Sequence, residues 1–232
     1  MIKNYSDFVT ALLDAGFSGA IGGKDDGVFG LFRYGWGAED ESSIHWHTGD
    51  PETDPWEWRM RVLNERSDIA YSKVFFRKAG YITKEWYPYF LSARRSGKSF
   101  EEMYADGIYS NFAKRIYELL RENDSLPLHE IKLLGGFDKK DVSRFEKALT
   151  DLQMGLFITM SGMQQKVSQI GIEYGWFSTV FCTTERFWSK DVFEQAASIS
   201  AGDAVEKITE RILKLNPSAD EKKIMKFIKG IN

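Results

Sequence analysis

The chain has a single cysteine and no long apolar run, and each shortage excludes a class of protein. Cys182 can form no internal disulfide, and a lone thiol cannot build a zinc site by itself. No apolar stretch approaches the roughly 20 residues that cross a bilayer. The first residues also lack the basic-then-apolar pattern of a signal peptide. We therefore expect a cytoplasmic protein with no membrane partner and no cofactor.

Positive charge is also scarce, because the formal net charge is −3. This balance excludes a protein that coats nucleic acid through bulk electrostatics, although it permits a local basic face. Aromatic residues, in contrast, make up 15% of the chain. Such a density predicts either a large core or a cleft lined by flat apolar rings. The rings gather at Trp46, Trp56, Trp58, Phe75, Phe76, Trp86, Tyr87, Tyr89 and Phe90.

The N-terminal part predicts several short elements. A first helix should have Ser6 or Asp7 as its N-cap, and residues 28–32 read as a strand or extended segment. The two prolines at 51 and 55 predict a rigid loop over 45–54, with Asp54 capping a helix that begins at Pro55. A further helix should start near Thr83 and bury apolar residues at helical spacing, namely Trp86, Phe90 and Leu91.

From residue 109 the apolar spacing predicts three helices followed by two strands. The second helix begins at Pro127 and ends at Gly135-Gly136, where a tight turn needs positive φ. Asp138 caps the third helix, whose inward positions are Val142, Phe145, Leu149 and Leu152. The strands are expected at 156–160 and 176–182. Three helices and a hairpin are typical of a winged helix, with the third helix as the reader and the hairpin as the wing.

The predicted fold is mainly α (α+β). A winged helix-turn-helix at 109–185 lies between an aromatic-rich N-terminal subdomain at 1–108 and a C-terminal helical arm at 186–232. The last helix of that arm is expected to start at Ser218 and to bury Ile224, Phe227 and Ile228.

Basic residues of the third helix are the best candidates for contacts with nucleic acid: Lys139, Lys140, Arg144 and Lys147. A recognition helix presents such residues to phosphates and groove edges. Arg77 and Lys78, with Arg94, Arg95 and Lys98, could line the same groove. The alternative is a solvated face of mixed charge, since acidic residues share the helix: Asp138, Asp141, Glu146 and Asp151.

The order of these segments resembles the AlkZ/YcaQ winged-helix family. The resemblance lies in Tyr71–Arg95, in the winged-helix segment Ile116–Thr183, and in the motif HTGDPETDPWEWR at His47–Arg59. That motif is similar to a bacterial subgroup described as AlkZ-related. The family includes DNA-repair glycosylases that remove alkylated or crosslinked bases, so the resemblance implies binding of double-stranded DNA and hydrolysis of an N-glycosidic bond.

The chain lacks the glutamine motif that positions the attacking water in those glycosylases. The pair Gln164-Gln165 lies in the expected wing, and Gln153 ends a helix. Kinship of fold does not settle chemistry. A second hypothesis is therefore a non-catalytic module that binds a small molecule, a nucleoside or a protein. The missing motif and the net negative charge motivate this alternative.

The His45–Arg59 segment could carry chemistry in two ways. A carboxylate, Asp50, Glu52 or Asp54, could activate water for attack at a sugar. His47 or Arg59 would orient that carboxylate. The side chains of His45, His47 and the neighbouring carboxylates could instead bind a divalent metal. The structural alternative, which we favour over a metal, is that these groups bind backbone amides and cap the next helix.

Three aromatic residues could stack on a base extruded from the duplex: Trp56, Trp58 and Tyr87. The alternative is that these rings fill a core. Cys182 is expected to be a small buried residue of the second strand, and His129 a capping or surface residue.

Overall fold

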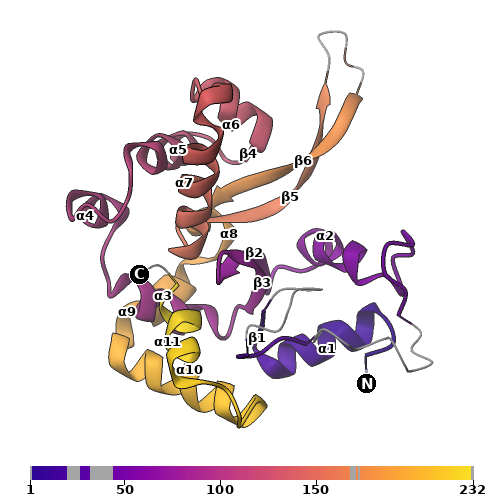
Figure 1. Cartoon of the computed structure of the whole chain (residues 1–232), viewed down its shortest axis with the longest axis vertical. Coiled ribbons are helices and arrows are strands. Elements are labelled where there is room, and N and C mark those ends of the chain that lie inside the picture. Colours follow the sequence, from indigo (N-terminus) through magenta and orange to yellow (C-terminus); the bar gives the residue numbers. More distant parts are fainter. Residues whose placement is uncertain (1, 20–26, 32–43, 168–170, 172, 231–232) are drawn as a thin grey trace.

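The computed structural model describes residues 2–19, 27–31, 44–167, 171 and 173–230. About half of the chain is helical, and the described strands form two small antiparallel sheets of three strands each (Figure 1). The fold is therefore α+β. No helix among the described residues is both long and apolar enough to cross a membrane.

The N-terminal elements are α1 (Tyr5–Ala15), β1 (Phe17–Ser18), α2 (Pro55–Glu65), β2 (Ile69–Phe75) and β3 (Lys78–Thr83), and the sheet order is β1-β3-β2. The predicted cap of α1 was wrong, since the Asn4 side chain accepts from the Asp7 amide at 2.9 Å. Residues 28–32 were expected to form a strand or an extended segment, and the strand alternative was wrong where the structure describes them. Residues 28–31 are irregular, and Phe32 lies outside the described residues.

The β2–β3 hairpin was not predicted from the sequence. Its turn places Phe76 and Arg77 at φ of 50° and 62°, a left-handed geometry usually signalled by Asn or Gly. No such residue stands at the turn, so the usual signal was absent.

Two further helices follow the hairpin, α3 (Tyr87–Arg95) and α4 (Phe100–Ala105). The expected start near Thr83 was four residues early, because Thr83 still pairs with Ile69 in the sheet. The buried positions of α3 were nevertheless predicted correctly, since Trp86, Phe90 and Leu91 are all buried.

The middle of the chain holds α5 (Asn111–Glu122), β4 (Leu126–Pro127), α6 (Leu128–Leu134), a 3-10 turn η1 (Lys139–Asp141), α7 (Val142–Met154), β5 (Ile158–Val167) and β6 (Glu173–Thr183). The sheet order is β4-β6-β5. Both long strands extend beyond the predicted ranges, and their outer half projects past the helices (Figure 1). Phe145, Leu149 and Leu152 are buried as predicted, but Val142 is 48% exposed because it belongs to the first turn of α7.

The C-terminal elements are α8 (Thr184–Phe187), α9 (Lys190–Ser198), α10 (Ala201–Leu215) and α11 (Glu221–Lys229). The cap of α11 is Asp220, which accepts from the Lys223 amide at 2.9 Å. The predicted cap, Ser218, instead binds the Asn216 side chain. Ile224, Phe227 and Ile228 are buried as predicted.

Three clusters of buried residues form the core. One joins α1 and α2 to β2 and β3, a second joins α4–α7 to β5 and β6, and a third joins α3 to the C-terminal helices. Gln153 of α7 links the first two regions, because its Oε1 accepts from the Ser72 hydroxyl at 2.9 Å and the Lys73 amide at 3.0 Å. The helix α7 is therefore fixed to the N-terminal sheet at its C-terminal end.

Candidate nucleic-acid interface

The outer face of η1 and α7 carries the predicted basic residues. Lys139, Lys140, Arg144 and Lys147 are all exposed, because the inward positions of the helix are taken by apolar side chains at helical spacing. Among the described residues, no other element covers this face, so all four side chains are open to a ligand in solution.

Acidic residues of the same segment pair with three of these cations. Lys140 lies 3.1 Å from Asp138, Arg144 2.6 Å from Asp141, and Lys147 2.6 Å from Asp151. Residues 128–154 contain five basic and five acidic side chains and carry no net charge. The face is thus exposed but electrically balanced, and its cations must exchange carboxylate partners to bind phosphate.

Arg77 lies beside this face. Its Nη1 donates to Asp151 at 2.8 Å, so the Asp151 carboxylate accepts hydrogen bonds from both Arg77 and Lys147. The β2–β3 turn therefore adds one exposed cation next to α7. Lys78 follows in the chain and begins β3, with an exposed side chain.

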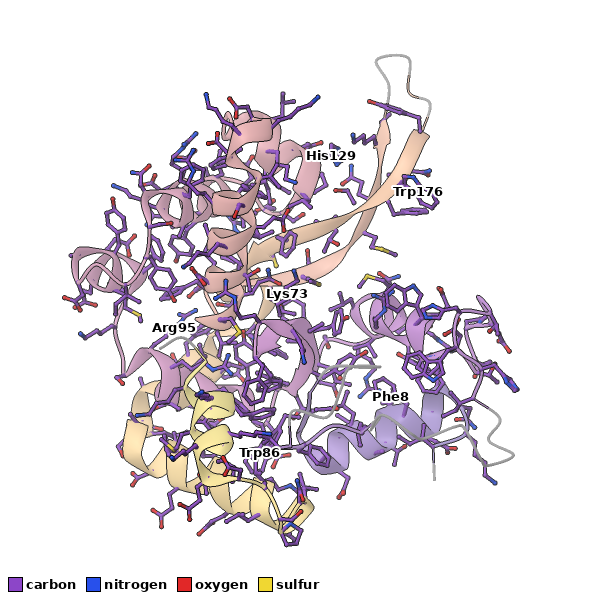
Figure 2. The ribbon with its side chains drawn as sticks, viewed as in Figure 1. Phe8, Lys73, Trp86, Arg95, His129 and Trp176 are labelled. Atoms are coloured by element: carbon purple, nitrogen blue, oxygen red, sulfur yellow. The ribbon has the colours of Figure 1, made fainter. Side chains whose placement is uncertain are left out.

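Arg94 and Arg95 do not extend this surface. Arg94 is buried, and its guanidinium donates to four backbone carbonyls, of Val74, Met154, Phe227 and Ile228. The Arg95 guanidinium lies over the Phe157 ring. It also donates to the Glu185 carboxylate and to the Gly155 carbonyl just before β5 (Arg95 is labelled in Figure 2). Both arginines hold elements together, while Lys98 pairs with Asp106 at 2.7 Å.

The hairpin presents an exposed aromatic patch that the sequence analysis missed. Trp176 is 93% exposed and Phe177 62% (Figure 2). Gln164 pairs with Ser178 and Lys166 with Tyr174, so three residues of β6 lie opposite the single residue Gln165. Such a β-bulge changes the direction of side chains on its strand. The signal in the sequence was Gly175, since glycine inside a strand pattern often marks a bulge.

Asp54 is fully buried and acts as a structural cap. Its carboxylate accepts from the amides of Thr48 at 2.8 Å, Gly49 at 3.0 Å and Trp56 at 2.8 Å. Burial opposes ionisation, but these amides outweigh it and hold the pKa of Asp54 below its usual value. Asp54 therefore caps α2 as predicted and closes the preceding loop.

The other residues of this loop lie near the surface. Asp50 is exposed, and the Glu52 amide and then the Thr53 hydroxyl lower the pKa of its carboxyl. The Arg59 guanidinium lies 3.3 Å from the Trp56 ring centroid, and the His47 ring lies 5.1 Å from the same ring. The structure thus gathers His47, Trp56 and Arg59, with Trp56 44% exposed.

The other two predicted stacking residues are buried in separate clusters. Trp58 stacks on Phe8 at 5.2 Å and donates to the Pro51 carbonyl at 3.0 Å. Tyr87 packs against Trp188 at 5.0 Å in the core around α3. Only Trp56 of the three is exposed enough to meet a base without opening the core.

No group of three or more His, Cys, Asp or Glu side chains among the described residues is arranged to hold a metal. In the His45 loop, the Asp54 carboxylate already binds backbone amides. The geometry of this loop matches the capping interpretation.

Replacing Asp54 with Asn tests the capping role. We expect a loss of about 1–2 kcal/mol in the free energy of unfolding, since one carboxylate serves several amides. A lowered folded pKa gives stability that is present above the unfolded pKa of about 3.9 and is lost as pH falls below it. Urea denaturation between pH 3 and 7 should show a weaker acid dependence in Asp54→Asn. Asp50→Asn should lose less of this dependence, because the exposed Asp50 carboxylate accepts from one backbone amide and the Asp54 carboxylate from three.

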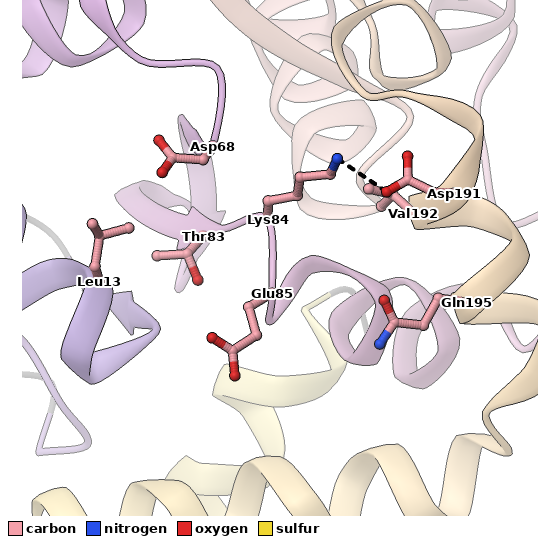
Figure 3. Close-up of a pocket in the computed structure, with 8 residues that line it drawn as sticks. All are labelled: Leu13, Asp68, Thr83, Lys84, Glu85, Asp191, Val192 and Gln195. Atoms are coloured by element: carbon pink, nitrogen blue, oxygen red, sulfur yellow. Dashed lines mark ion pairs between the residues drawn. The ribbon is translucent and has the colours of Figure 1, made fainter.

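A polar pocket of about 410 Å³ lies between α1, β3 and α9, away from these residues (Figure 3). Lys84 crosses it to Asp191 at 3.0 Å and to the Ser189 hydroxyl at 3.0 Å. The pocket contains none of the predicted site residues. Its lysine is already paired, so it offers little free binding capacity.

A family model described as AlkZ related matches residues 2–229, while no curated protein and no solved structure matches the chain. The match covers the basic face of α7, the aromatic hairpin and the His47–Arg59 loop together. It confirms the resemblance on which the sequence analysis relied. The chain belongs to the AlkZ-related family.

Proposed function

We propose that this protein binds double-stranded DNA through a winged helix formed by residues 109–185. In this proposal α7 is the recognition helix and the β5–β6 hairpin is the wing. The observation that carries it is the exposed basic face of α7, next to a projecting hairpin.

The topology supports the proposal. The order is helix, short strand, two helices and a hairpin, and the short strand β4 pairs with β6 at the hairpin base. Winged helices place the third helix in the major groove and use the hairpin beside it. Here the cations of α7 are exposed to solvent, three of them paired with neighbouring carboxylates, while its apolar side packs on α5.

The contacts of the His47–Arg59 loop support binding rather than bond cleavage. Asp54 has no free access to water, and its amide donors oppose proton uptake. Asp50 is exposed but has a lowered pKa, which makes it a weak general base near neutral pH. Arg59 on Trp56 offers a cation and a flat ring instead. This loop would serve as a secondary contact with DNA.

Fluorescence anisotropy with a labelled duplex tests the proposal. Four phosphate contacts predict a slope of about −3.6 in log K against log salt, so affinity should fall about 100-fold between 50 and 200 mM salt. Replacing Lys139, Lys140, Arg144 and Lys147 with Gln removes all four contacts and should flatten that slope by up to about 3.6 units. Because carboxylates already pair with these cations, the measured salt slope and its change in the variant should both be smaller than these limits.

The matched control replaces four exposed lysines of α11 with Gln: Lys222, Lys223, Lys226 and Lys229. Both variants lose four positive charges, so a long-range effect of net charge alone would weaken them equally. Equal loss, or no salt-dependent binding of the native protein at micromolar concentration, would reject the recognition role of α7.

A second candidate function is an interaction module that binds no DNA. The balanced charge of residues 128–154 favours it, because DNA-binding surfaces are strongly positive. The same titration separates the two, since this candidate predicts no duplex affinity at either salt concentration.

A further inference from the structure

A groove of about 830 Å³ runs along the base of the hairpin. It is lined by α2 at Asn64, by the turn before β4, by β5 and β6, and by α8. We call it the hairpin groove and define it by Asn64, Gln164, Val180, Cys182, Arg186 and Phe187. Its volume suits one nucleotide-sized ligand.

The lining has the chemistry that a flat polar ring requires. Phe187, which is half-buried, gives an apolar surface, and the largely buried Val180 lies behind it in the lining. The Asn64 and Gln164 amides each offer a donor and an acceptor, and both are exposed. A bound base needs donors and acceptors along its edge and a flat apolar surface against its face.

A cation stands at one end of the groove. Arg186 pairs with Asp124, whose side chain is 95% exposed, and donates to the Arg121 carbonyl at 3.1 Å. A highly exposed carboxylate exchanges readily with another anion, because solvent weakens such pairs. A phosphate attached to the ring could therefore replace Asp124 on Arg186.

The bulge places stacking surfaces farther along the same hairpin. Trp176 and Phe177 expose flat rings outward from Ser178 and Gln164, which pair across the strands. Figure 2 shows Trp176 projecting from the outer part of the hairpin. Aromatic rings next to a polar groove are typical of proteins that bind unpaired nucleotides, since every base has a π-face.

We propose that the hairpin groove receives an unpaired nucleotide, with Trp176 stacked on a neighbouring base and Arg186 on its phosphate. The inference rests on the proposed DNA binding and names its preferred target, DNA with an unpaired base. It also accounts for the balanced charge of α7, because stacking adds affinity that phosphate contacts alone do not supply.

The test compares a matched duplex with the same duplex carrying one bulged 2-aminopurine nucleotide, in anisotropy titrations at a single salt concentration. We expect at least tenfold tighter binding of the bulged duplex. The variant Trp176→Ala should remove most of this preference, because it should weaken binding of the bulged duplex far more than binding of the matched duplex, which the hairpin also contacts. Trp176 is almost fully exposed, so its loss should not unfold the protein, which circular dichroism checks.

Two further variants separate the groove from the rings. A double variant, Asn64→Ala with Gln164→Ala, should weaken the bulged duplex alone and alter the 2-aminopurine emission of the complex. The matched control is Trp56→Ala, which removes an exposed tryptophan of α2 outside the groove. Because Trp56 belongs to the secondary DNA contact, this variant should weaken both duplexes equally and so retain the preference.

The outcomes distinguish the two proposals. Equal affinity for both duplexes overturns the groove inference and leaves DNA binding by α7 standing. Absence of binding to either duplex overturns both. A preference that Trp56→Ala abolishes and Trp176→Ala retains would move the site to α2 and overturn the inference as stated.

Discussion

Replacing Arg94 with Met is expected to reduce the free energy of unfolding by about 3–5 kcal/mol. Arg94 is buried without a carboxylate partner among the described residues, and burial lowers its pKa to about 10, so it stays charged at neutral pH. Its four acceptors come from β2, from the end of α7 and from the end of α11. Methionine fills similar space but offers no hydrogen-bond donor to any of these four carbonyls.

The control for Arg94 is Arg77→Met. Arg77 also binds α7, through Asp151, but its side chain is about half exposed, and surface pairs contribute at most about 1 kcal/mol. Urea denaturation followed by tryptophan fluorescence measures both variants. If Arg94→Met unfolded at the same urea concentration as Arg77→Met, the hydrogen bonds from Arg94 to β2, α7 and α11 would not stabilise the fold more than a surface ion pair does.

Replacing Gly16 with Ala is expected to cost about 2–5 kcal/mol. Gly16 ends α1 at φ 90°, a conformation that costs a residue with a Cβ about 1–2 kcal/mol. An added Cβ would also lie 2.2 Å from the Trp86 ring, and overpacking typically costs about 1–3 kcal/mol more. Trp86 is buried and packs on Phe17, so it has little freedom to move.

Gly49→Ala is the matched control, because Gly49 also has positive φ but no atom within 4 Å of an added Cβ. It reports the conformational cost alone. The melting temperature of Gly16→Ala should be well below that of Gly49→Ala. Equal melting temperatures would show that the Trp86 ring moves aside without loss of stability.

The sequence predicted elements wherever local chemistry marked their ends. Pro55 with Asp54 located α2, and apolar spacing located the buried face of α7. The N-terminal sheet was missed for two reasons: the β2–β3 turn lacks the usual Asn or Gly, and β1 pairs with a strand far along the chain. Thr83, for example, donates to the Gly16 carbonyl through both its amide and its hydroxyl. The β2–β3 turn itself contains no glycine.

The candidate site was predictable only in part. Residue type predicted the cations of α7, but whether each would find a carboxylate depended on the helical register and on Arg77. The three proposed stacking rings differ in burial, since Trp56 is exposed and the other two are buried. Trp56 and Trp58 are two residues apart on one helix, so α2 turns one outward and the other onto Phe8. The aromatic hairpin depended on a bulge that apolar periodicity does not reveal.

The buried cysteine offers a practical route to following the hairpin in solution. Burial raises the pKa of the Cys182 thiol to about 11 from 9.0, so its thiolate fraction at neutral pH is about one-hundredth of the ordinary value. Maleimide dyes should therefore largely ignore the native protein. A cysteine introduced at residue 177 would take a single fluorophore, and its emission would report ligand binding at the β5–β6 hairpin.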